Sequence, residues 1–446
     1  MINMVIIMQR KIYDELKKWK NTLNAKPLML MGARQCGKTY IIKEFCKNNY
    51  KNVVYVNLFS QDNIIDLYKS NFTSDEKFLQ LKVLLDSELE GDDTCLFIDE
   101  IQESEELISE LKYFNEEHPK MHIICAGSLL GLKLKRLKKA FPVGKVAMLN
   151  MYPMDFEEFL WAMGENNMIE LLKKCYAENK AVSNPVHEKA LNLYRIYLIT
   201  GGMPESIQNM LDVNKDYIKY NTNIIPSIVE GYFNDMQKYV KNNAESLKVS
   251  RIYDSLPNQL SNLSNKFQYS KIDSNARSRD YESALDWLLA SNLVLQAKAV
   301  KLPGVPLEGF VDTDAFKLYL SDVGILNYKL NISLGDILTD NISLYKGVIA
   351  ENYVVNQLVC KKYNLYYWRN DDYEIDFLLY TKDGIIPMEV KANKNVTSKS
   401  LTKYIDLYKP KYAIRISTKN FGYDEEAKIK SVPIYAIFCI DDYVGR

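Results

Sequence analysis

The segment GARQCGKT, residues 32–39, constrains this chain more than any other part of its sequence. It fits the pattern G-x-x-x-x-G-K-[ST] and lies between an apolar stretch, Leu28–Met31, and a helix-forming stretch that begins at Tyr40. Glycines let backbone N–H groups curl around phosphate oxygens, and the N-terminus of the following helix adds positive potential. The segment therefore predicts a phosphate-binding loop; a tight glycine turn in an unrelated α/β protein is the alternative.

In a loop of this kind the lysine reaches the β- and γ-phosphates of a nucleotide, and the threonine hydroxyl is a ligand of Mg²⁺. Lys38 and Thr39 are the residues in these positions. The predicted nucleotide-binding residues are Gly32, Ala33, Arg34, Gln35, Cys36, Gly37, Lys38, Thr39 and Tyr40.

A second motif, TCLFIDEIQ at residues 94–102, is an apolar stretch that ends in two acidic residues. We expect Asp99 to hold the Mg²⁺ and Glu100 to orient or deprotonate the attacking water. An exposed acidic strand end is the alternative. A further apolar stretch ends at Ser128, which could sense the γ-phosphate or simply cap the end of a strand.

Short apolar stretches alternate with helical patterns between residues 26 and 155. This alternation predicts one α/β domain with a mostly parallel sheet. The predicted strands are Pro27–Met31, Val53–Leu58, Cys95–Ile98, His122–Ala126 and Val146–Leu149.

Composition excludes several other classes of protein. Basic and acidic residues are equal in number, 57 each, so binding to a polyanion through bulk charge is not expected, although a local basic groove is compatible with this balance. The sequence has no apolar run near the ~20 residues needed to cross a bilayer and no secretory leader, which predicts a cytoplasmic protein without a membrane partner. Seven cysteines without a C-x-x-C pair and only three histidines argue against disulfide scaffolds and zinc sites.

The chain resembles the AAA-type ATPases of bacteria and archaea that carry a long C-terminal region of unknown function. The residues that carry the resemblance are GARQCGKT, LFIDEIQ, AGSLL, FPVGK, YPMDFEEFL, GGMPES, IPSIVEGYFNDM, LPNQLSN, KFQYSKI, FKLYLSDVGIL, GVIAENYV, EIDFLL and MEVKAN. The resemblance implies ATP binding and hydrolysis, with ATP and Mg²⁺ as cofactors. Members of this family often carry an arginine shortly before the YP segment, where this chain has Lys145; Arg34 and Arg136 are other basic candidates for sensing the γ-phosphate.

The same resemblance implies a fold of several parts. A P-loop NTPase parallel sheet with helices on both faces would occupy residues 1–160. A helical lid would follow at 161–245 and a winged-helix-like module at 246–340. A restriction-endonuclease-like α/β core would occupy residues 341–446.

A second constellation of charged residues lies in the stretch Tyr373–Ala392. A turn signal between two apolar runs predicts a hairpin in which Asp376 faces Glu389 and Glu374 faces Lys391, all on one face. Like charges directly opposed destabilise such a pair, and a divalent cation, Mg²⁺ or Mn²⁺, between Asp376 and Glu389 would remove that conflict. Lys391 could then stabilise a hydroxide or a developing phosphate charge.

This arrangement resembles the PD-(D/E)XK nuclease superfamily, in which an acidic residue on a preceding helix joins the site. Glu351 fits that role because it shares a helical stripe with apolar residues and so faces the core. Surface ion pairs across the strands are the alternative, and cores of this kind often lose catalysis.

Two features suggest DNA as a partner. The stretch KLKRLKK at residues 133–139 could contact phosphates or be a solvated basic loop. Arg277 and Arg279 precede a regular helical pattern, as suits a winged helix on DNA, although winged helices also serve as ATPase lids or protein docks.

Three hypotheses of function follow. The first is an Mg²⁺-dependent ATPase whose nucleotide state controls a nuclease-like, DNA-interacting C-terminal module. The second is a non-cleaving switch in which ATP gates contact with protein or nucleic acid. The third is a signalling ATPase that assembles into homo-oligomeric rings or filaments.

Overall fold

The computed structural model describes residues 8–127, 130, 144–240, 242–262, 266–370, 372–392 and 399–443. Its contacts divide the chain into two compact units, where the sequence predicts four parts. The N-terminal unit is Gln9–Tyr152 with Ala290–Asn292, and the C-terminal unit is the rest of the chain. None of the described helices is both long and apolar enough to span a bilayer.

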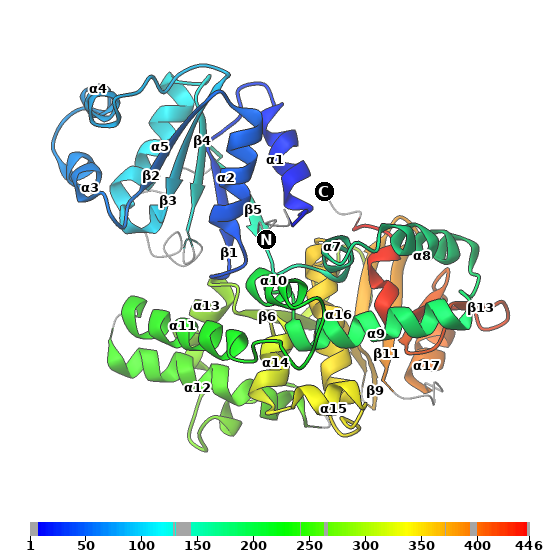
Figure 1. Cartoon of the computed structure of the whole chain (residues 1–446). Coiled ribbons are helices and arrows are strands. Elements are labelled where there is room, and N and C mark those ends of the chain that lie inside the picture. The colour runs from blue at the N-terminus through cyan, green and yellow to red at the C-terminus, as the bar shows by residue number, and fades with distance from the viewer. Residues whose placement is uncertain are drawn as a thin grey trace. The chain divides into compact units, whose positions relative to one another are not determined.

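The N-terminal unit is built on a parallel sheet of five strands in the order β2-β3-β4-β1-β5 (Figure 1). The strands are β1 (Leu28–Gly32), β2 (Asn52–Asn57), β3 (Thr94–Asp99), β4 (His122–Ala126) and β5 (Ala147–Met151). Its helices are α1 (Ile12–Lys20), α2 (Lys38–Asn49), α3 (Asp62–Lys69), α4 (Ser74–Leu85) and α5 (Glu105–Glu117), with a 3-10 turn η1 (Ile101–Glu103). The predicted α/β sheet is confirmed, and each predicted strand lies within two residues of an observed one.

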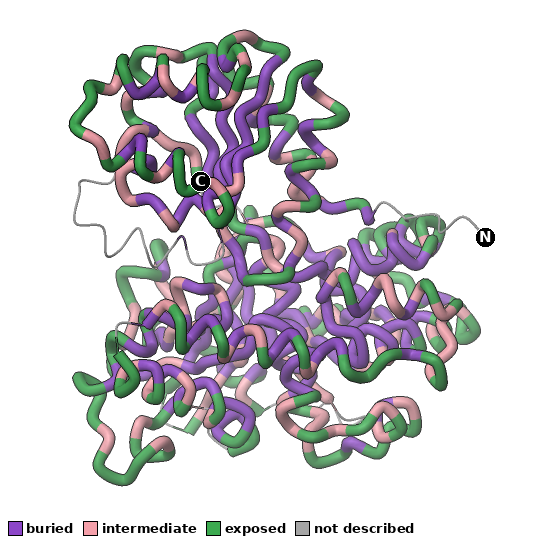
Figure 2. The backbone as a smooth tube through the Cα atoms, turned by 60° about the vertical axis from the view of Figure 1, so that its left-hand side comes forward, coloured by how far each residue is buried: buried purple, intermediate pink, exposed green. Residues whose placement is uncertain are grey.

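Both faces of this sheet are covered, because successive residues of a strand point to opposite sides and both sides are apolar. Leu96 and Ile98 pack with the helices α3, α4 and α5, whereas Cys95 and Phe97 pack with α1 and α2. The strands β3 and β4 are buried at every residue, as the purple strands in the middle of this unit show in Figure 2.

The C-terminal unit contains most of the described helices of the chain. They are α7 (Phe156–Ala162), α8 (Asn166–Glu178), α9 (Asn184–Thr200), α10 (Pro204–Asp212), α11 (Ile224–Tyr239), α12 (Asn243–Leu260), α13 (Ser278–Ala290), α14 (Val323–Lys329), α15 (Leu334–Leu338), α16 (Lys346–Cys360) and α17 (Lys399–Tyr408), with 3-10 turns η2 (Tyr269–Lys271), η3 (Leu307–Phe310) and η4 (Ile434–Cys439).

Two sheets complete this unit. One has the order β7-β6-β8-β9 and the other β10-β11-β12-β14-β13. The strands are β6 (Val294–Val300), β7 (Val311–Leu320), β8 (Tyr366–Asn370), β9 (Tyr373–Ile375), β10 (Phe377–Thr381), β11 (Gly384–Lys391), β12 (Ala413–Ser417), β13 (Gly422–Asp424) and β14 (Ile429–Pro433). The antiparallel pair β6–β7 lies within residues 246–340, for which a winged-helix-like module is predicted, and β6 also pairs in parallel with β8.

The segment predicted as a lid packs on helix α16 of the segment predicted as a nuclease-like core. The ring of Tyr197 on α9 lies 5.6 Å from that of Tyr353 on α16. The backbone N–H of Phe156 donates to Gln357 Oε1 at 2.7 Å, so the start of α7 is also tied to α16. These contacts explain why helices and sheets distant in sequence form one compact unit.

Two of the sequence motifs meet at a buried carboxylate. Asp322 accepts hydrogen bonds from the Gly202 N–H at 2.6 Å and from the Ile325 N–H at 3.1 Å, where it caps α14. Gly201 has a positive φ of 60°, and a Cβ there would lie 2.1 Å from Asp322 Oδ1, so this close approach requires glycine. Burial raises the pKa of Asp322 to about 6, although the backbone N–H groups oppose the shift.

Candidate functional site

The glycine-rich loop connects the end of β1 to the start of α2. Gly32 has a φ of 150° and Gly37 a φ of 94°, which place both in backbone conformations that favour glycine. A Cβ on Gly32 would lie 2.2 Å from the carbonyl oxygen of Met151 on β5, so a larger residue would push the loop away from its neighbouring strand. The sequence pattern is thus explained by backbone geometry.

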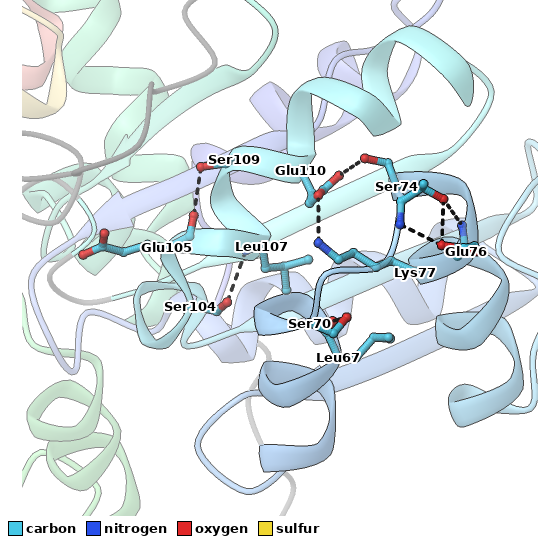
Figure 3. Close-up of polar contacts among 11 residues, drawn as sticks. Leu67, Ser70, Ser74, Glu76, Lys77, Ser104, Glu105, Leu107, Ser109 and Glu110 are labelled. Carbon is cyan, nitrogen blue, oxygen red and sulfur yellow. Dashed lines mark hydrogen bonds and ion pairs between the residues drawn. The ribbon is translucent and has the colours of Figure 1, made fainter.

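The N-terminus of α2 is open, unlike those of two other helices in the same unit. Helix α2 has no side-chain cap and no acidic residue in its first turn. In contrast, the Leu107 N–H of α5 donates to Ser104 Oγ, and Glu105 lies in that helix's first turn (Figure 3). Helix α4 has a capping box and two acidic residues in its first turn. Because helix N-termini attract anions, the open end of α2 is suited to a phosphate.

Lys38 lies in the first turn of α2 and is only 7% exposed. Its ammonium donates to the carbonyl oxygens of Gly32 at 2.9 Å and Ala33 at 2.7 Å, within its own loop. Both acceptors are neutral, so the charge of Lys38 has no carboxylate partner in these two bonds. A phosphate group could therefore compete for the ammonium on favourable terms.

Thr39 lies in the first turn of α2, directly after the loop, and Asp99 is the last residue of β3; their side chains meet. The Thr39 hydroxyl donates to Asp99 Oδ2 at 2.9 Å, and the Tyr55 hydroxyl donates to the same oxygen at 3.2 Å. A hydroxyl and a carboxylate oxygen this close are ligands that Mg²⁺ prefers. The residues present thus fit the magnesium ion that the sequence predicts.

Glu100 follows Asp99 in a left-handed backbone conformation, with a φ of 56°. The buried Gln102 donates from Nε2 to Glu100 Oε2 and so holds the carboxylate. Gln102 itself packs against Gly127, where a Cβ would lie 2.1 Å from its Oε1. Sequence reasoning missed Gln102, although its place two residues after Glu100 in the motif was a usable signal.

Arg10 is a second residue that sequence reasoning missed. Its guanidinium is buried and donates to the Cys36 carbonyl at 2.9 Å and the Tyr152 carbonyl at 2.7 Å. It therefore connects the phosphate-binding loop to Tyr152, the residue directly after β5. No motif around Arg10 indicates this role, because both acceptors are backbone atoms far away in sequence.

The remaining predicted residues of this site differ in their surroundings. Arg34, Gln35 and Tyr40 are exposed, whereas Ala33 and Cys36 are buried under the loop. Lys145 pairs with Glu116 on α5 at 2.9 Å. Ser128, Arg136 and the basic stretch 133–139 lie outside the described residues.

In the C-terminal unit, the predicted hairpin register is confirmed. Phe377 pairs with Met388 and Thr381 with Gly384 in β10–β11, as predicted, so the residues that follow Asp376 and precede Glu389 are paired. Asp376 lies at a bend just before β10, and its Oδ2 accepts the Val390 N–H at 2.7 Å. Burial raises the pKa of the Asp376 carboxyl well above its ordinary value, and the carboxylate of Glu389 adds to the shift.

The predicted pairing of Glu374 with Lys391 is wrong. The bend at Asp376 sends Glu374 into β9, which pairs with β8 in the other sheet, so Glu374 lies opposite Arg369 in that ladder. Lys391 instead pairs with Glu389 at 2.5 Å. The charged residues predicted to share one face of a hairpin are thus divided between two sheets, with Glu374 in β9 and Glu389 and Lys391 in β11.

Lys317 of β7, which sequence reasoning missed, lies among these carboxylates. Its Nζ is 3.1 Å from Glu351 Oε1 on α16 and 2.6 Å from Glu374 Oε1 on β9. Burial alone would lower the pKa of Lys317, but the Glu351 carboxylate and the other acidic groups outweigh it, so the pKa is raised well above its ordinary value. Glu351 is buried, as predicted.

A divalent metal does not fit this cluster as the side chains stand. Lys317 bonds Glu351, and Lys391 bonds Glu389, so two ammonium groups stand against carboxylates that the prediction gives to a metal site. Within the described ranges, no group of three or more His, Cys, Asp or Glu side chains is arranged to hold a metal ion. The nuclease-like assignment therefore stays a prediction.

Comparison with known proteins finds a relative that matches along nearly all of both chains, and solved structures that match about three quarters of this chain. The chain is 23% identical over 457 residues to an uncharacterized protein, MJ1544, of Methanocaldococcus jannaschii, which covers 96% of this chain and 91% of that protein. The Walker-type ATPase PABY2304 of Pyrococcus abyssi is 15% identical and matches 73% of this chain and 96% of its own, with a TM-score of 0.43. The ORC2 protein of Aeropyrum pernix is 10% identical and matches 76% and 96%, with a TM-score of 0.39.

Family models match three parts of the chain. Residues 191–335 match a domain of unknown function (DUF8612), and residues 346–437 match another (DUF4143). Residues 24–160, which hold the glycine-rich loop and the acidic strand end, match an AAA domain. The N-terminal part of this chain is therefore an AAA-type P-loop domain.

Proposed function

We propose that the N-terminal unit binds ATP and hydrolyses it with the help of Mg²⁺. The observation that carries the proposal is the open N-terminus of α2, which has Lys38 and Thr39 in its first turn and no acidic residue there. The Thr39 hydroxyl lies 2.9 Å from Asp99, so the phosphate-binding loop and the acidic strand end meet at one place.

Binding would exchange the partners of Lys38. Its ammonium would leave the carbonyls of Gly32 and Ala33 for phosphate oxygens, because a charged acceptor forms the stronger hydrogen bond. Thr39 and Asp99 would hold Mg²⁺, which when bound neutralises charge on the β- and γ-phosphates.

Hydrolysis would depend on Glu100. Its carboxylate would orient the attacking water or accept its proton. Gln102 would keep that carboxylate in place, since its amide donates to Glu100 in the structure.

The test is ATP hydrolysis by the full chain, with nucleotide binding measured in parallel. We expect hydrolysis in Mg²⁺ that stops with EDTA. Glu100→Gln should keep nucleotide binding and lose hydrolysis by about 10²- to 10⁴-fold. Glu103→Gln, a matched change three residues further on, should hydrolyse like the wild type. Equal rates for Glu100→Gln and the wild type would contradict the assignment.

For the C-terminal unit, we propose that the nucleotide state gates contact with DNA without cleavage. Arg277 and Arg279 are exposed at the start of α13, where guanidinium groups can reach phosphates. Two lysines already bond the carboxylates on which a metal-dependent cleavage would rely. These observations favour the switch over the nuclease hypothesis.

Fluorescence anisotropy with labelled duplex DNA tests this part. We expect the affinity for DNA to differ between ADP and a non-hydrolysable ATP analogue, and to fall in a double variant with Arg277→Glu and Arg279→Glu. Lys174→Glu, a matched charge change at an exposed lysine of α8, should bind like the wild type. DNA cut by the wild-type chain in Mn²⁺ would support the nuclease hypothesis instead.

A further inference from the structure

The cluster around Lys317 joins three elements of the C-terminal unit. Lys317 lies on β7, in the segment predicted as a winged-helix-like module, and is 1% exposed. Its side chain reaches Glu351 on α16 and Glu374 on β9. A lysine this deeply buried needs partners for its charge, and both partners come from the segment predicted as a nuclease-like core.

The environment of the ammonium is well matched to a cation. It bonds two carboxylates at 3.1 and 2.6 Å and lies 5.0 Å from the centre of the Tyr367 ring, whose face attracts positive charge. The Tyr319 hydroxyl donates to the same Glu351 oxygen at 2.5 Å. Glu351 Oε1 thus receives both an ammonium and a hydroxyl.

We propose that the ammonium of Lys317 is the resident cation of this cluster: it lies between Glu351 and Glu374 and keeps a divalent metal from using Glu351 together with the predicted ligands Asp376 and Glu389. A metal ion binds carboxylate oxygens at about 2.0–2.6 Å, so it cannot share Glu351 Oε1 with the ammonium and the Tyr319 hydroxyl. Metal binding at this oxygen would require Lys317 to leave Glu351, and the side chain of Lys317 is 1% exposed.

The pair Lys391 and Glu389 closes the other side of the cluster. The ammonium of Lys391 lies 2.5 Å from Glu389 Oε1, so Glu389, a predicted metal ligand, also has an ammonium partner. Asp376 accepts the Val390 N–H, so its Oδ2 is already bonded to the backbone of β11. Glu351, Glu389 and Asp376 thus each have one carboxylate oxygen bonded by a donor of the chain, whereas the buried Oε2 atom of Glu389 accepts no hydrogen bond from the described residues.

Mn²⁺ binding to the protein without nucleotide tests this role of Lys317. Mn²⁺ binding is measured by electron paramagnetic resonance on the full chain in an Asp99→Asn background, so that the phosphate-binding loop contributes no metal site. We expect that Glu389→Gln does not reduce Mn²⁺ binding, because the parent chain should have no Mn²⁺ site in this cluster. Added Lys317→Met should raise Mn²⁺ affinity by roughly tenfold or more, because the carboxylates then lack their cation.

Two further variants make the result specific. Lys317→Arg keeps the charge and should bind no more Mn²⁺ than the parent. Lys317→Met combined with Glu351→Gln should lose the gained site. If Lys317→Met does not fold, the comparison of the parent chain with its Glu389→Gln variant still decides the question.

Two outcomes would overturn the proposal. One is Mn²⁺ binding by the parent chain that Glu389→Gln or Asp376→Asn abolishes, since a metal would then share the cluster with Lys317. The other is a folded Lys317→Met protein that gains no Mn²⁺ site. Neither outcome depends on ATP hydrolysis, so this inference and the proposed ATPase function can fail separately.

Discussion

Lys38 in the N-terminal unit and Lys317 in the C-terminal unit are both buried lysines with two oxygen acceptors each. The acceptors of Lys38 are backbone carbonyls of its own loop, whereas those of Lys317 are carboxylates from two other elements. A neutral carbonyl is readily replaced by a phosphate oxygen, but a buried carboxylate that loses its cation is left with an uncompensated charge. The first arrangement suits a ligand site, and the second suits a fixed part of the fold.

The same substitution at both lysines should separate these roles most clearly in stability. Lys317→Met should lower the free energy of unfolding by about 3–5 kcal/mol, because the buried carboxylate of Glu351 would lose the ammonium that compensates its charge. Lys38→Met should cost about 1–2 kcal/mol at most, since only hydrogen bonds to carbonyls are lost. Urea unfolding followed by circular dichroism measures both values. Equal losses for the two variants would remove the distinction.

Catalysis should show the reverse order. Lys38→Met should reduce ATP hydrolysis by about 10²- to 10³-fold, because a charge aimed at the transferred phosphate is lost. Lys47→Met, on the exposed side of the same helix, serves as the control and should leave the rate unchanged. A small effect of Lys38→Met on a folded protein would mean that its ammonium does not leave the loop carbonyls.

Asp322 extends the comparison to a buried carboxylate held by backbone N–H groups instead of a lysine. Its folded pKa of about 6 is raised by burial, so the folded state binds the proton more tightly than the unfolded state, and this group's contribution to stability falls as pH rises from about 4 to about 6. The loss approaches about 3 kcal/mol. Asp322→Asn cannot ionise, so relative to the wild type it should gain that amount between pH 4 and pH 7.

Urea unfolding of both proteins over this pH range provides the measurement. The variant loses one acceptor oxygen, so its absolute stability can be lower at every pH. The difference between the two proteins nevertheless isolates Asp322 from the other titrating groups. A difference that does not change with pH would show that Asp322 keeps an ordinary pKa.

The smallest expected effect concerns Gln102. Gln102→Leu should slow ATP hydrolysis by about 10- to 100-fold, since Glu100 would lose the amide that positions it. Nucleotide affinity should change little, because the hydrogen bond that the variant loses is made to Glu100 and not to the residues predicted to bind phosphate. The control is Gln208→Leu on α10. Weaker nucleotide binding with an unchanged turnover rate would assign Gln102 to binding and not to positioning.

Sequence reasoning predicted the parts of this structure that depend on local pattern. The strand His122–Ala126 has the predicted bounds because an apolar stretch between two helical patterns defines a buried parallel strand. The register of the β10–β11 hairpin was predictable because the turn at Thr381–Gly384 fixes it. The spacing of the glycine-rich loop predicts that Lys38 and Thr39 bind phosphate and Mg²⁺, and these roles stay predictions.

The parts that were missed depend on partners far apart in sequence. Lys317 and Glu351 are separated by 34 residues, and Arg10 reaches a carbonyl 142 residues away. The pairing predicted for Glu374 failed because alternation along a strand carries no information on the bend at Asp376. Which charged side chains meet is decided by how the sheets pack, and that information is not present in the local pattern.

The strand β6 pairs with β7 on one side and with β8 on the other. Expressing residues 341–446 alone would remove β6, leave β8 with an open hydrogen-bonding edge, and leave Glu351 without its ammonium. Such a fragment should be prone to aggregate through that edge. Protein engineers who wish to separate the C-terminal module would therefore do better to begin the clone upstream of α13, so that the hairpin is carried along.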